Sequence, residues 1–281
     1  MRTAGIDIGS RTVKLAIVED GRPVCARVLE NSFEPLAVCR RLLEGQSYQA
    51  ILATGYGRHL FAEKMGGRAI TEIKAAAIGA RHLFPGCTCV LDIGGQDTKA
   101  IALDAAGAVG RFEMNDKCAA GTGRFVEVMA MALGCTLEEF SALAGERAAG
   151  ERAAGEGLAG TGLAGMGADP QGLNSTCAVF AESEAVGLIA RGRPRSEIAA
   201  RVVASIAGRA AALVRRVGGE GPVVFLGGVA RCTPLRQALE RRRGGGGGPP
   251  PGGAPPGGPG GAGGARAGGG GRGGGAPRGG G

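Results

Sequence analysis

An Asp-x-Gly turn between two apolar segments occurs twice in this chain, at residues 7–9 and again at residues 92–94. The segments on both sides of each turn have the length and apolar content that are typical of strands. Helix-like segments follow each set of strands. The repeat therefore predicts an α/β protein made of two related lobes.

The elements around the two turns follow a similar order. The first cycle is predicted to contain strands at 4–9, 12–19 and 23–30, a helix near 34–44 and a strand at 50–54. The second is predicted to contain a helix at 72–83, strands at 88–93, 97–103 and 109–114, and a helix at 122–133. We place the first lobe at residues 1–86 and the second at 87–243.

Both turns have the composition of phosphate-binding loops. A Gly turn between strands brings backbone N–H groups close to a phosphate, and a neighbouring carboxylate can hold Mg²⁺ through water. Hydroxyl groups and a lysine for phosphate oxygens follow the first turn. The expected phosphate-binding residues are Gly9, Ser10, Thr12, Lys14, Gly94 and Gly95, and the expected catalytic residues are Asp7, Asp92, Gln96 and Asp97.

A single Asp-x-Gly is more often a plain turn than a binding site. Here a third Gly turn follows in Phe225-Leu226-Gly227-Gly228-Val229-Ala230, and the order of all three favours a nucleotide site. The arrangement is similar to that of the superfamily of actin, sugar kinases and heat-shock ATPases, whose adenosine-binding strand and turn this segment resembles. The resemblance implies a two-lobe actin-like fold with duplicated ribonuclease-H-like lobes. Lys99 could be an ordinary solvated charge.

Two cysteines, Cys118 and Cys177, directly precede segments that become apolar at helical spacing. Free N–H groups and the positive end of the helix dipole favour a thiolate there. An iron–sulfur cluster needs about four thiolates, and a symmetric dimer would double two ligands into four. A dimer-bridging zinc site with four thiolates is the alternative. The other six cysteines are expected to be small core residues.

The segments around these cysteines, including Lys117-Cys118-Ala119-Ala120-Gly121-Thr122-Gly123 and Asn174-Ser175-Thr176-Cys177, closely resemble the activators of 2-hydroxyacyl-CoA dehydratases and the ATPase subunits of benzoyl-CoA reductases. The resemblance covers about residues 1–240. It includes Gly5-Ile6-Asp7-Ile8-Gly9-Ser10, Ala53-Thr54-Gly55-Tyr56-Gly57-Arg58 and Asp92-Ile93-Gly94-Gly95-Gln96-Asp97.

The resemblance implies an ATP-driven one-electron donor that activates an acyl-CoA dehydratase or reductase. Its cofactors would be ATP, Mg²⁺ and one four-iron four-sulfur (4Fe-4S) cluster per homodimer, held by Cys118 and Cys177 of both subunits. Ferredoxin or flavodoxin would supply the electrons. The implied nucleotide-binding residues further include Arg11, Val13, Ala120, Gly227 and Gly228.

The net charge of +8 at first suggests a nucleic-acid partner. However, residues 236–281 carry seven Arg and one Glu, so the rest of the chain is nearly neutral. With 4% aromatic residues and no Trp, the chain also lacks stacking platforms for single strands. No signal-peptide segment or uninterrupted apolar span is apparent, which favours a cytoplasmic protein without membrane contact.

Two segments have low complexity. Residues 144–155 repeat a five-residue unit and lead into a Gly-rich stretch; because each Gly costs about 1 kcal/mol in a helix, we interpret 144–172 as an inserted surface loop or frayed helix. Residues 244–281 contain only Gly, Pro, Ala and Arg and are predicted to be disordered. The resembling family has a further strand and helix there, so we interpret this tail as a frameshift or truncation.

Two other functions stay open at this point. A sugar or small-acid kinase of the same superfamily would need a carboxylate facing its substrate but neither Cys118 nor Cys177. A truncated ATPase relic would retain dimerisation without catalysis.

Overall fold

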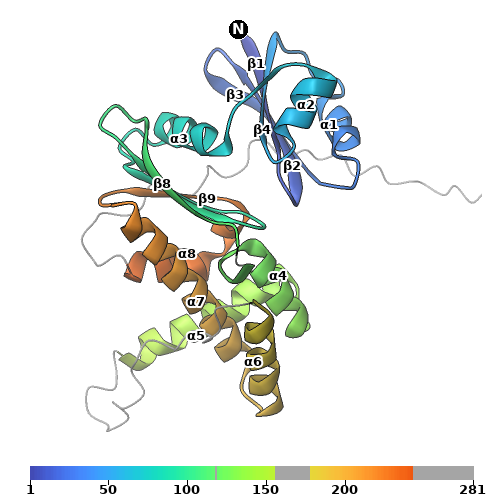
Figure 1. The fold of residues 1–281 in the computed structure, drawn as a ribbon. Coiled ribbons are helices and arrows are strands. Elements are labelled where there is room, and N and C mark those ends of the chain that lie inside the picture. Colours follow the sequence, from blue (N-terminus) through green and yellow to red (C-terminus); the bar gives the residue numbers. More distant parts are fainter. Residues whose placement is uncertain (118, 156–177, 243–281) are drawn as a thin grey trace, which may run out of the picture.

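The computed structural model describes residues 1–117, 119–155 and 178–242. Two sheets, each with its own helices, form two lobes (Figure 1). The elements of the first lobe are β1 (Arg2–Ile8), β2 (Thr12–Glu19), β3 (Arg22–Glu30), α1 (Pro35–Leu43), β4 (Ala50–Gly55), α2 (Arg58–Met65) and β5 (Arg68–Ala69).

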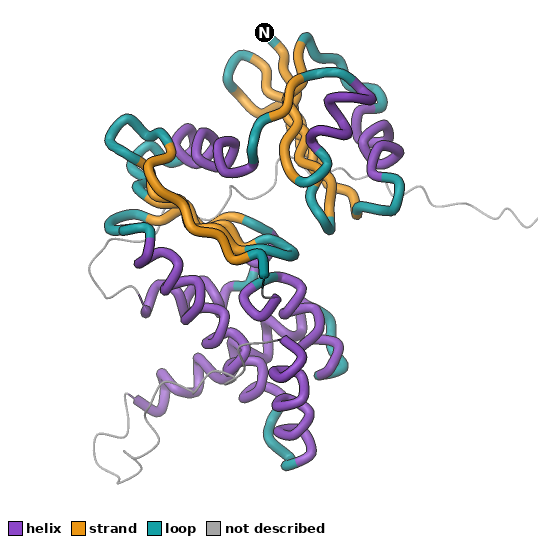
Figure 2. Tube along the Cα trace, in the orientation of Figure 1, coloured by secondary structure: helices purple, strands orange, loops and turns teal. Residues whose placement is uncertain are grey.

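The second lobe carries most of the helices, which gather on one side of its sheet (Figure 2). Its elements are β6 (Cys89–Ile93), β7 (Thr98–Leu103), β8 (Val109–Asn115), the 3₁₀ helix η1 (Ala119–Gly121), α4 (Gly123–Ala132), α5 (Leu137–Gly155), α6 (Ala178–Ala190), α7 (Arg195–Arg216), β9 (Val223–Leu226), the 3₁₀ helix η2 (Gly228–Arg231) and α8 (Thr233–Arg242). The helix α3 (Glu72–Leu83) precedes the predicted boundary but packs on the second sheet.

The first sheet has the strand order β3-β2-β1-β4-β5. β1, β2 and β3 are antiparallel neighbours, whereas β4 is parallel to β1 and β5 to β4. Alternate residues of β1 and β2 are buried together, as strand periodicity requires: Ala4, Ile6, Ile8, Val13, Leu15 and Ile17. α1 and α2 cover this apolar face, so the opposite face, which carries Asp7, is not needed for the core.

The second sheet, β8-β7-β6-β9, repeats the antiparallel hairpins of the first and places β9 parallel to β6. Both of its faces are covered. Leu91, Ile93 and Ala100 belong to the core that contains α4, α7 and α8, while Val90 and Ile101 pack with residues of α3. α3 also contacts β4 of the first lobe. The boundary at residues 86 and 87 stays a prediction.

The two hairpins match in register, residue for residue. Asp7 lies opposite Lys14, and Asp92 lies opposite Lys99. In each turn the glycine N–H donates to a carbonyl three residues later, from Gly9 to Thr12 at 3.1 Å and from Gly94 to Asp97 at 2.9 Å. The predicted fold, with two related α/β lobes, is confirmed. For the strands and helices that the sequence analysis predicted, the observed bounds agree with the predicted ones to within two residues.

Of the two interpretations of residues 144–155, loop or frayed helix, the structure favours the helix, because they form the C-terminal part of α5. Ala144 is buried in the core of the second lobe, and a Cβ at Gly145 would lie 3.5 Å from the ring of Pro234. Tertiary packing against α8 offsets the helix-breaking tendency of the glycines. Residues 156–172 of the insertion, the tail 244–281, and both Cys118 and Cys177 lie outside the described residues.

In the described part of the chain, no single helix is both long and apolar enough to cross a membrane. α4 and the first half of α5 together reach that length and composition, but they meet at 84°. Their apolar side chains, including Phe125, Met129 and Phe140, are buried in the core of the second lobe.

Candidate nucleotide site

The first loop is a tight turn whose conformation is fixed by its neighbours. Besides the Gly9 N–H bond to Thr12, the side chain of Asn31 donates to the Gly9 carbonyl at 2.7 Å. Beside the turn, Lys14 Nζ lies 2.7 Å from Asp7 Oδ2. Both side chains are partly exposed, so the pair can exchange this contact for a phosphate or a hydrated cation.

The second loop is attached to the start of α4. The N–H of Gly123 donates to the Gly94 carbonyl at 2.8 Å, and that of Arg124 to the Gly95 carbonyl at 2.9 Å. The first N–H groups of a helix have no partner within the helix. Here two of them bind the loop backbone, which makes the loop and the beginning of α4 one continuous structure.

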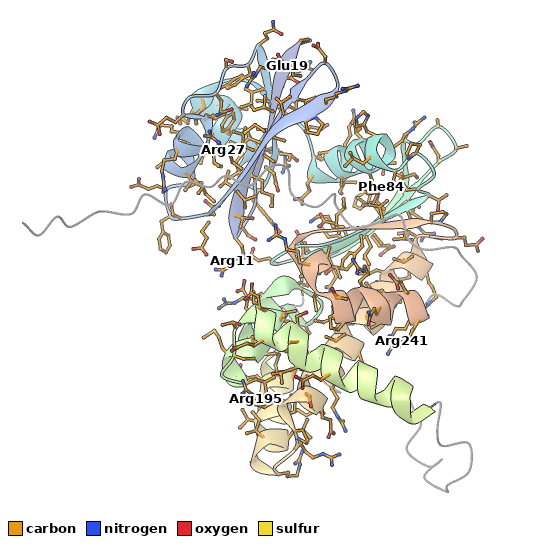
Figure 3. The ribbon with its side chains drawn as sticks, turned by 180° about the vertical axis from the view of Figure 1, so that it is seen from behind. Arg11, Glu19, Arg27, Phe84, Arg195 and Arg241 are labelled. Atoms are coloured by element: carbon orange, nitrogen blue, oxygen red, sulfur yellow. The ribbon has the colours of Figure 1, made fainter. Side chains whose placement is uncertain are left out.

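The two loops face each other across the lobe boundary. A Cβ at Gly95 would lie 2.7 Å from Arg11 Cγ and 3.4 Å from Ser10 Oγ, so a side chain there would force Arg11 to shift. Arg11 Nε also donates to Glu127 Oε1 of α4 at 3.2 Å. Figure 3 shows Arg11 at the end of the first lobe that points toward the second. The sequence-predicted loops are therefore brought together.

Backbone donors are available at the tips of both loops. Within the part of the chain that the structure describes, the N–H groups of Ser10, Arg11, Gly95 and Gln96 make no recorded hydrogen bond. Unpaired N–H groups at Gly turns are the donors that a phosphate uses. The facing tips can therefore bind an anion from two sides.

A buried charge network lies beside the second loop. Asp97 is 3% exposed and Lys99 is 2% exposed. Asp97 Oδ1 accepts a short hydrogen bond from Lys99 Nζ, which also lies 3.1 Å from Glu72 Oε1 at the start of α3. Asp97 Oδ2 accepts a hydrogen bond from the Tyr56 hydroxyl at 2.8 Å. These carboxylates keep the pKa of Lys99 above its usual value despite burial.

Asp92 differs from the other carboxylates of the site. Burial raises the pKa of Asp92 to about 6, with Asp97, Glu72 and Asp7 acting in the same direction and Lys99 opposing them. No hydrogen bond or ion pair of its side chain is recorded among the described residues. A carboxylate with such a pKa can accept a proton near neutral pH, and in its deprotonated form it can bind a hydrated cation.

A glycine with a positive φ lies beside each of the two carboxylates Asp7 and Asp92. Gly55 (φ +83°) is the last residue of β4, and Gly227 (φ +91°) follows β9; these strands are parallel to β1 and β6 respectively. A Cβ at Gly55 would lie 2.5 Å from Asp7 Oδ1, and one at Gly227 would lie 2.8 Å from Asp92 Oδ1. The third Gly turn of the sequence therefore lies beside the second loop, and its adenosine-binding role stays a prediction.

The remaining predicted residues have varied positions. Gln96 is exposed at the loop tip, and Gly228 is exposed beyond β9. The side chain of Val13 is buried in the core of the first lobe, so only its backbone can serve a ligand. Ala120 is buried in η1. The individual roles of all these site residues stay predictions.

The sequence predicted the buried charge network around Asp97 only in part. Lys99 is not a solvated charge, and neither Tyr56 nor Glu72 was assigned a role. A signal for Lys99 existed, because it follows Asp92 at the same spacing as Lys14 follows Asp7. Tyr56 and Glu72 lie far from Asp97 in sequence and give no comparable signal.

The sequence model of the BadF/BadG/BcrA/BcrD ATPase family matches residues 4–246. The chain belongs to this ATPase family. The resemblance inferred from the cysteine segments and the Gly turns is therefore confirmed.

Relatives within the family carry a consistent set of names. The activator of lactoyl-CoA dehydratase from Anaerotignum propionicum is 39% identical over 245 residues, covering 82% of this chain and 84% of that protein. Among solved structures, component A of the (R)-2-hydroxyglutaryl-CoA dehydratase of Acidaminococcus fermentans is 34% identical with a TM-score of 0.71, covering 86% of this chain and 88% of that chain.

A second structure is the activator of the 2-hydroxyisocaproyl-CoA dehydratase from Clostridium difficile with bound ADPNP. It is 31% identical with a TM-score of 0.72 and covers 86% of each chain. These likenesses extend over both lobes of the ATPase, and they confirm the actin-like fold class.

Proposed function

We propose that this ATPase is an ATP-dependent electron donor that activates a 2-hydroxyacyl-CoA dehydratase or a benzoyl-CoA reductase-type partner. One observation carries the proposal: the N–H groups of Gly123 and Arg124 bind the second phosphate loop, and Cys118 precedes Gly123 by five residues. A change in the phosphate loop is thus transmitted through a short, hydrogen-bonded segment to a thiolate. The activators among the relatives support the same assignment.

The ATP chemistry is assigned to the facing loops. The N–H groups of Ser10, Arg11, Gly95 and Gln96 would bind phosphate oxygens, and Lys14 would leave Asp7 to add its charge to them. Asp7 and Asp92 would hold Mg²⁺ through water, as hard oxygen ligands do. Asp92 suits the proton-accepting role better than Asp97, because both carboxylate oxygens of Asp97 already accept hydrogen bonds.

Cys118 and Cys177 are proposed to hold a 4Fe-4S cluster together with the same residues of a second subunit. Cys118 directly precedes η1, and Cys177 directly precedes α6; η1 and α6 contact each other, so the two chain segments approach one another. No group of three or more metal-ligating side chains occurs among the described residues, to which neither cysteine belongs. When bound, such a cluster supplies one-electron transfer.

The chain's own residues provide the coupling between the two sites. Thr98, at the start of β7, donates through its hydroxyl to the Gly121 carbonyl at 2.8 Å, and the Thr122 hydroxyl donates to the Ala119 carbonyl at 2.7 Å. The segment after Cys118 is thereby attached to the second hairpin at η1 as well as at α4. Movement of that hairpin when the lobes close on ATP would move η1 and α4 together.

The proposal also covers partners and location. We expect a homodimer in the cytoplasm, a ferredoxin or flavodoxin as electron source, and two lobes divided near residue 86. An acyl-CoA dehydratase or reductase component would accept the electron.

The test is anaerobic purification followed by a visible spectrum, an iron count per dimer and calorimetric titration with ATP. The proposal expects about four iron atoms per dimer and their loss in Cys118→Ser and in Cys177→Ser. Cys39→Ser is the control, because Cys39 is fully buried in the first lobe and burial raises the pKa of its thiol to about 11. ATP binding without iron would favour the sugar or small-acid kinase, and absence of both would favour a relic. Zinc in place of iron would contradict electron transfer.

A further inference from the structure

Tyr56 connects the two phosphate loops although it belongs to neither. It lies in the turn between β4 and α2 of the first lobe, and its hydroxyl donates to Asp97 Oδ2 of the second lobe at 2.8 Å. The residue as a whole is 57% exposed. Removal of its hydroxyl would therefore change a polar contact with little loss of core packing.

The backbone on both sides of Tyr56 is packed tightly against the first loop. The Gly57 N–H donates to the Ile8 carbonyl at 3.1 Å, and a Cβ at Gly57 would lie 2.4 Å from Ile8 Cγ2. A Cβ at Gly55 would lie 2.5 Å from both Asp7 Oδ1 and the Ile8 carbonyl oxygen. Tyr56 is thus fixed to the base of the first loop by its neighbours and to the second loop by its hydroxyl.

Asp97 depends on this contact for its orientation. Lys99 binds Oδ1, and Lys99 is itself anchored to Glu72 of α3. Among the described residues of the other lobe, Tyr56 is the one that binds Oδ2. If the lobes separate, Oδ2 of this nearly inaccessible carboxylate loses its donor, which is costly for a buried charge.

We propose that Tyr56 is a positioning residue that holds Asp97 and thereby couples the distance between the lobes to the geometry of the phosphate site. This inference rests on the proposed ATP site between the loops. With the lobes closed, Tyr56 and Lys99 together fix Asp97 beside Gly94; with the lobes open, Asp97 keeps Lys99 but loses the contact that orients Oδ2. Burial, the hydrogen bond to Asp97 and its negative charge raise the pKa of Tyr56 to about 12, so its hydroxyl remains a donor at neutral pH.

The chain offers a matched control, because it contains two tyrosines and no tryptophan. Tyr48 is exposed and has no recorded hydrogen bond through its hydroxyl. In the full-length protein, Tyr56→Phe should lower kcat for ATP hydrolysis about tenfold or more, the equivalent of one hydrogen bond to a charged group, while KM changes less. Tyr48→Phe should leave both constants unchanged.

A double-mutant cycle separates positioning from a merely structural effect. In an Asp97→Asn background, Tyr56→Phe should cause little further loss of kcat, because both changes act on one contact. If the double variant loses kcat by the product of the two single-variant factors, the two residues act independently and the proposal is overturned. A Tyr56→Phe protein with the kcat of the wild type would overturn it as well.

A readout that does not need ATP tests the contact itself. In the Tyr48→Phe protein all tyrosine fluorescence comes from Tyr56, and a hydrogen bond to a carboxylate quenches it. Asp97→Asn should therefore raise that emission, but should not change the emission of Tyr48 in the Tyr56→Phe protein. Unchanged Tyr56 emission overturns the inference while leaving the ATPase function intact. If the emission rises but the wild-type protein neither binds nor hydrolyses ATP, the proposed function fails, and the positioning role fails with it.

Discussion

Lys14 and Lys99 occupy equivalent register positions in the two hairpins, but their surroundings differ. The Lys14 side chain is 47% exposed beside Asp7, whereas that of Lys99 is 3% exposed between Asp97 and Glu72. An exposed ion pair contributes about 0–1 kcal/mol. Loss of one partner from a buried pair costs about 3–5 kcal/mol, because the remaining charge stays buried without compensation.

We therefore expect Lys99→Met to lower the free energy of unfolding by about 3 kcal/mol and Lys14→Met by less than about 1 kcal/mol. Lys14→Met should instead weaken ATP binding, because it removes a charge from the phosphate site. Denaturant unfolding and calorimetric titration measure the two effects. Equal stability losses in both variants would show that the buried network does not carry the stability assigned to it.

At the residue scale, the sequence predicted the facing loops but not what connects them. The loop residues are local in sequence, and each Asp, Gly and hydroxyl has a recognisable spacing. The contact between Tyr56 and Asp97 joins residues 41 positions apart, and that between Arg11 and Glu127 joins residues 116 apart. Such contacts arise only when the lobes pack, so no spacing rule identifies them.

At the scale of elements, the strands were predictable because short apolar segments bounded by turns are typical of buried strands. In β1 and β2 the buried residues also alternate. α5 was not predictable in this way, since propensity disfavours its glycines while packing against α7 and α8 stabilises the helix. The hydrogen bonds from α4 to the second loop were also invisible in sequence, although the helix itself was predicted.

The turn after β9 provides a test at this scale. Gly227 has a φ of +91°, and a Cβ there would lie 2.1 Å from the Ile93 carbonyl oxygen, whereas a Cβ at Gly228 would meet nothing within 4 Å. Gly227→Ala should therefore lower the free energy of unfolding by about 2 kcal/mol or more, and Gly228→Ala by less than about 0.5 kcal/mol. Thermal unfolding of the two variants measures this difference in stability. If Gly227→Ala were as stable as the wild-type protein, the turn would not be packed against β6.

At the scale of the whole molecule, the lobes meet at the loops and at α3, which packs on the second sheet and also contacts β4. Arg11 and Tyr56 of the first lobe bind Glu127 and Asp97 of the second. The site is therefore built from both lobes, and its geometry depends on how far they are apart.

The composition of residues 244–281 gives a further prediction for the whole chain. A segment of Gly, Pro, Ala and a few Arg has little apolar surface to bury. A chain that ends at Arg243 should therefore have a free energy of unfolding within about 0.5 kcal/mol of the full chain. If thermal unfolding shows a markedly lower free energy of unfolding for the shortened chain, the tail packs on the folded part. That result would contradict our interpretation of the tail.

The central claim is that nucleotide in the loops acts on the segment that carries Cys118. The most direct measurement is the rate of iron release to a ferrous chelator from anaerobically purified dimer, with and without Mg²⁺ and ATP. We expect ATP to change that rate about fivefold or more in the wild-type protein and to leave it unchanged in Asp7→Asn, whose cluster should still assemble. A wild-type rate that does not respond to saturating ATP would contradict the coupling.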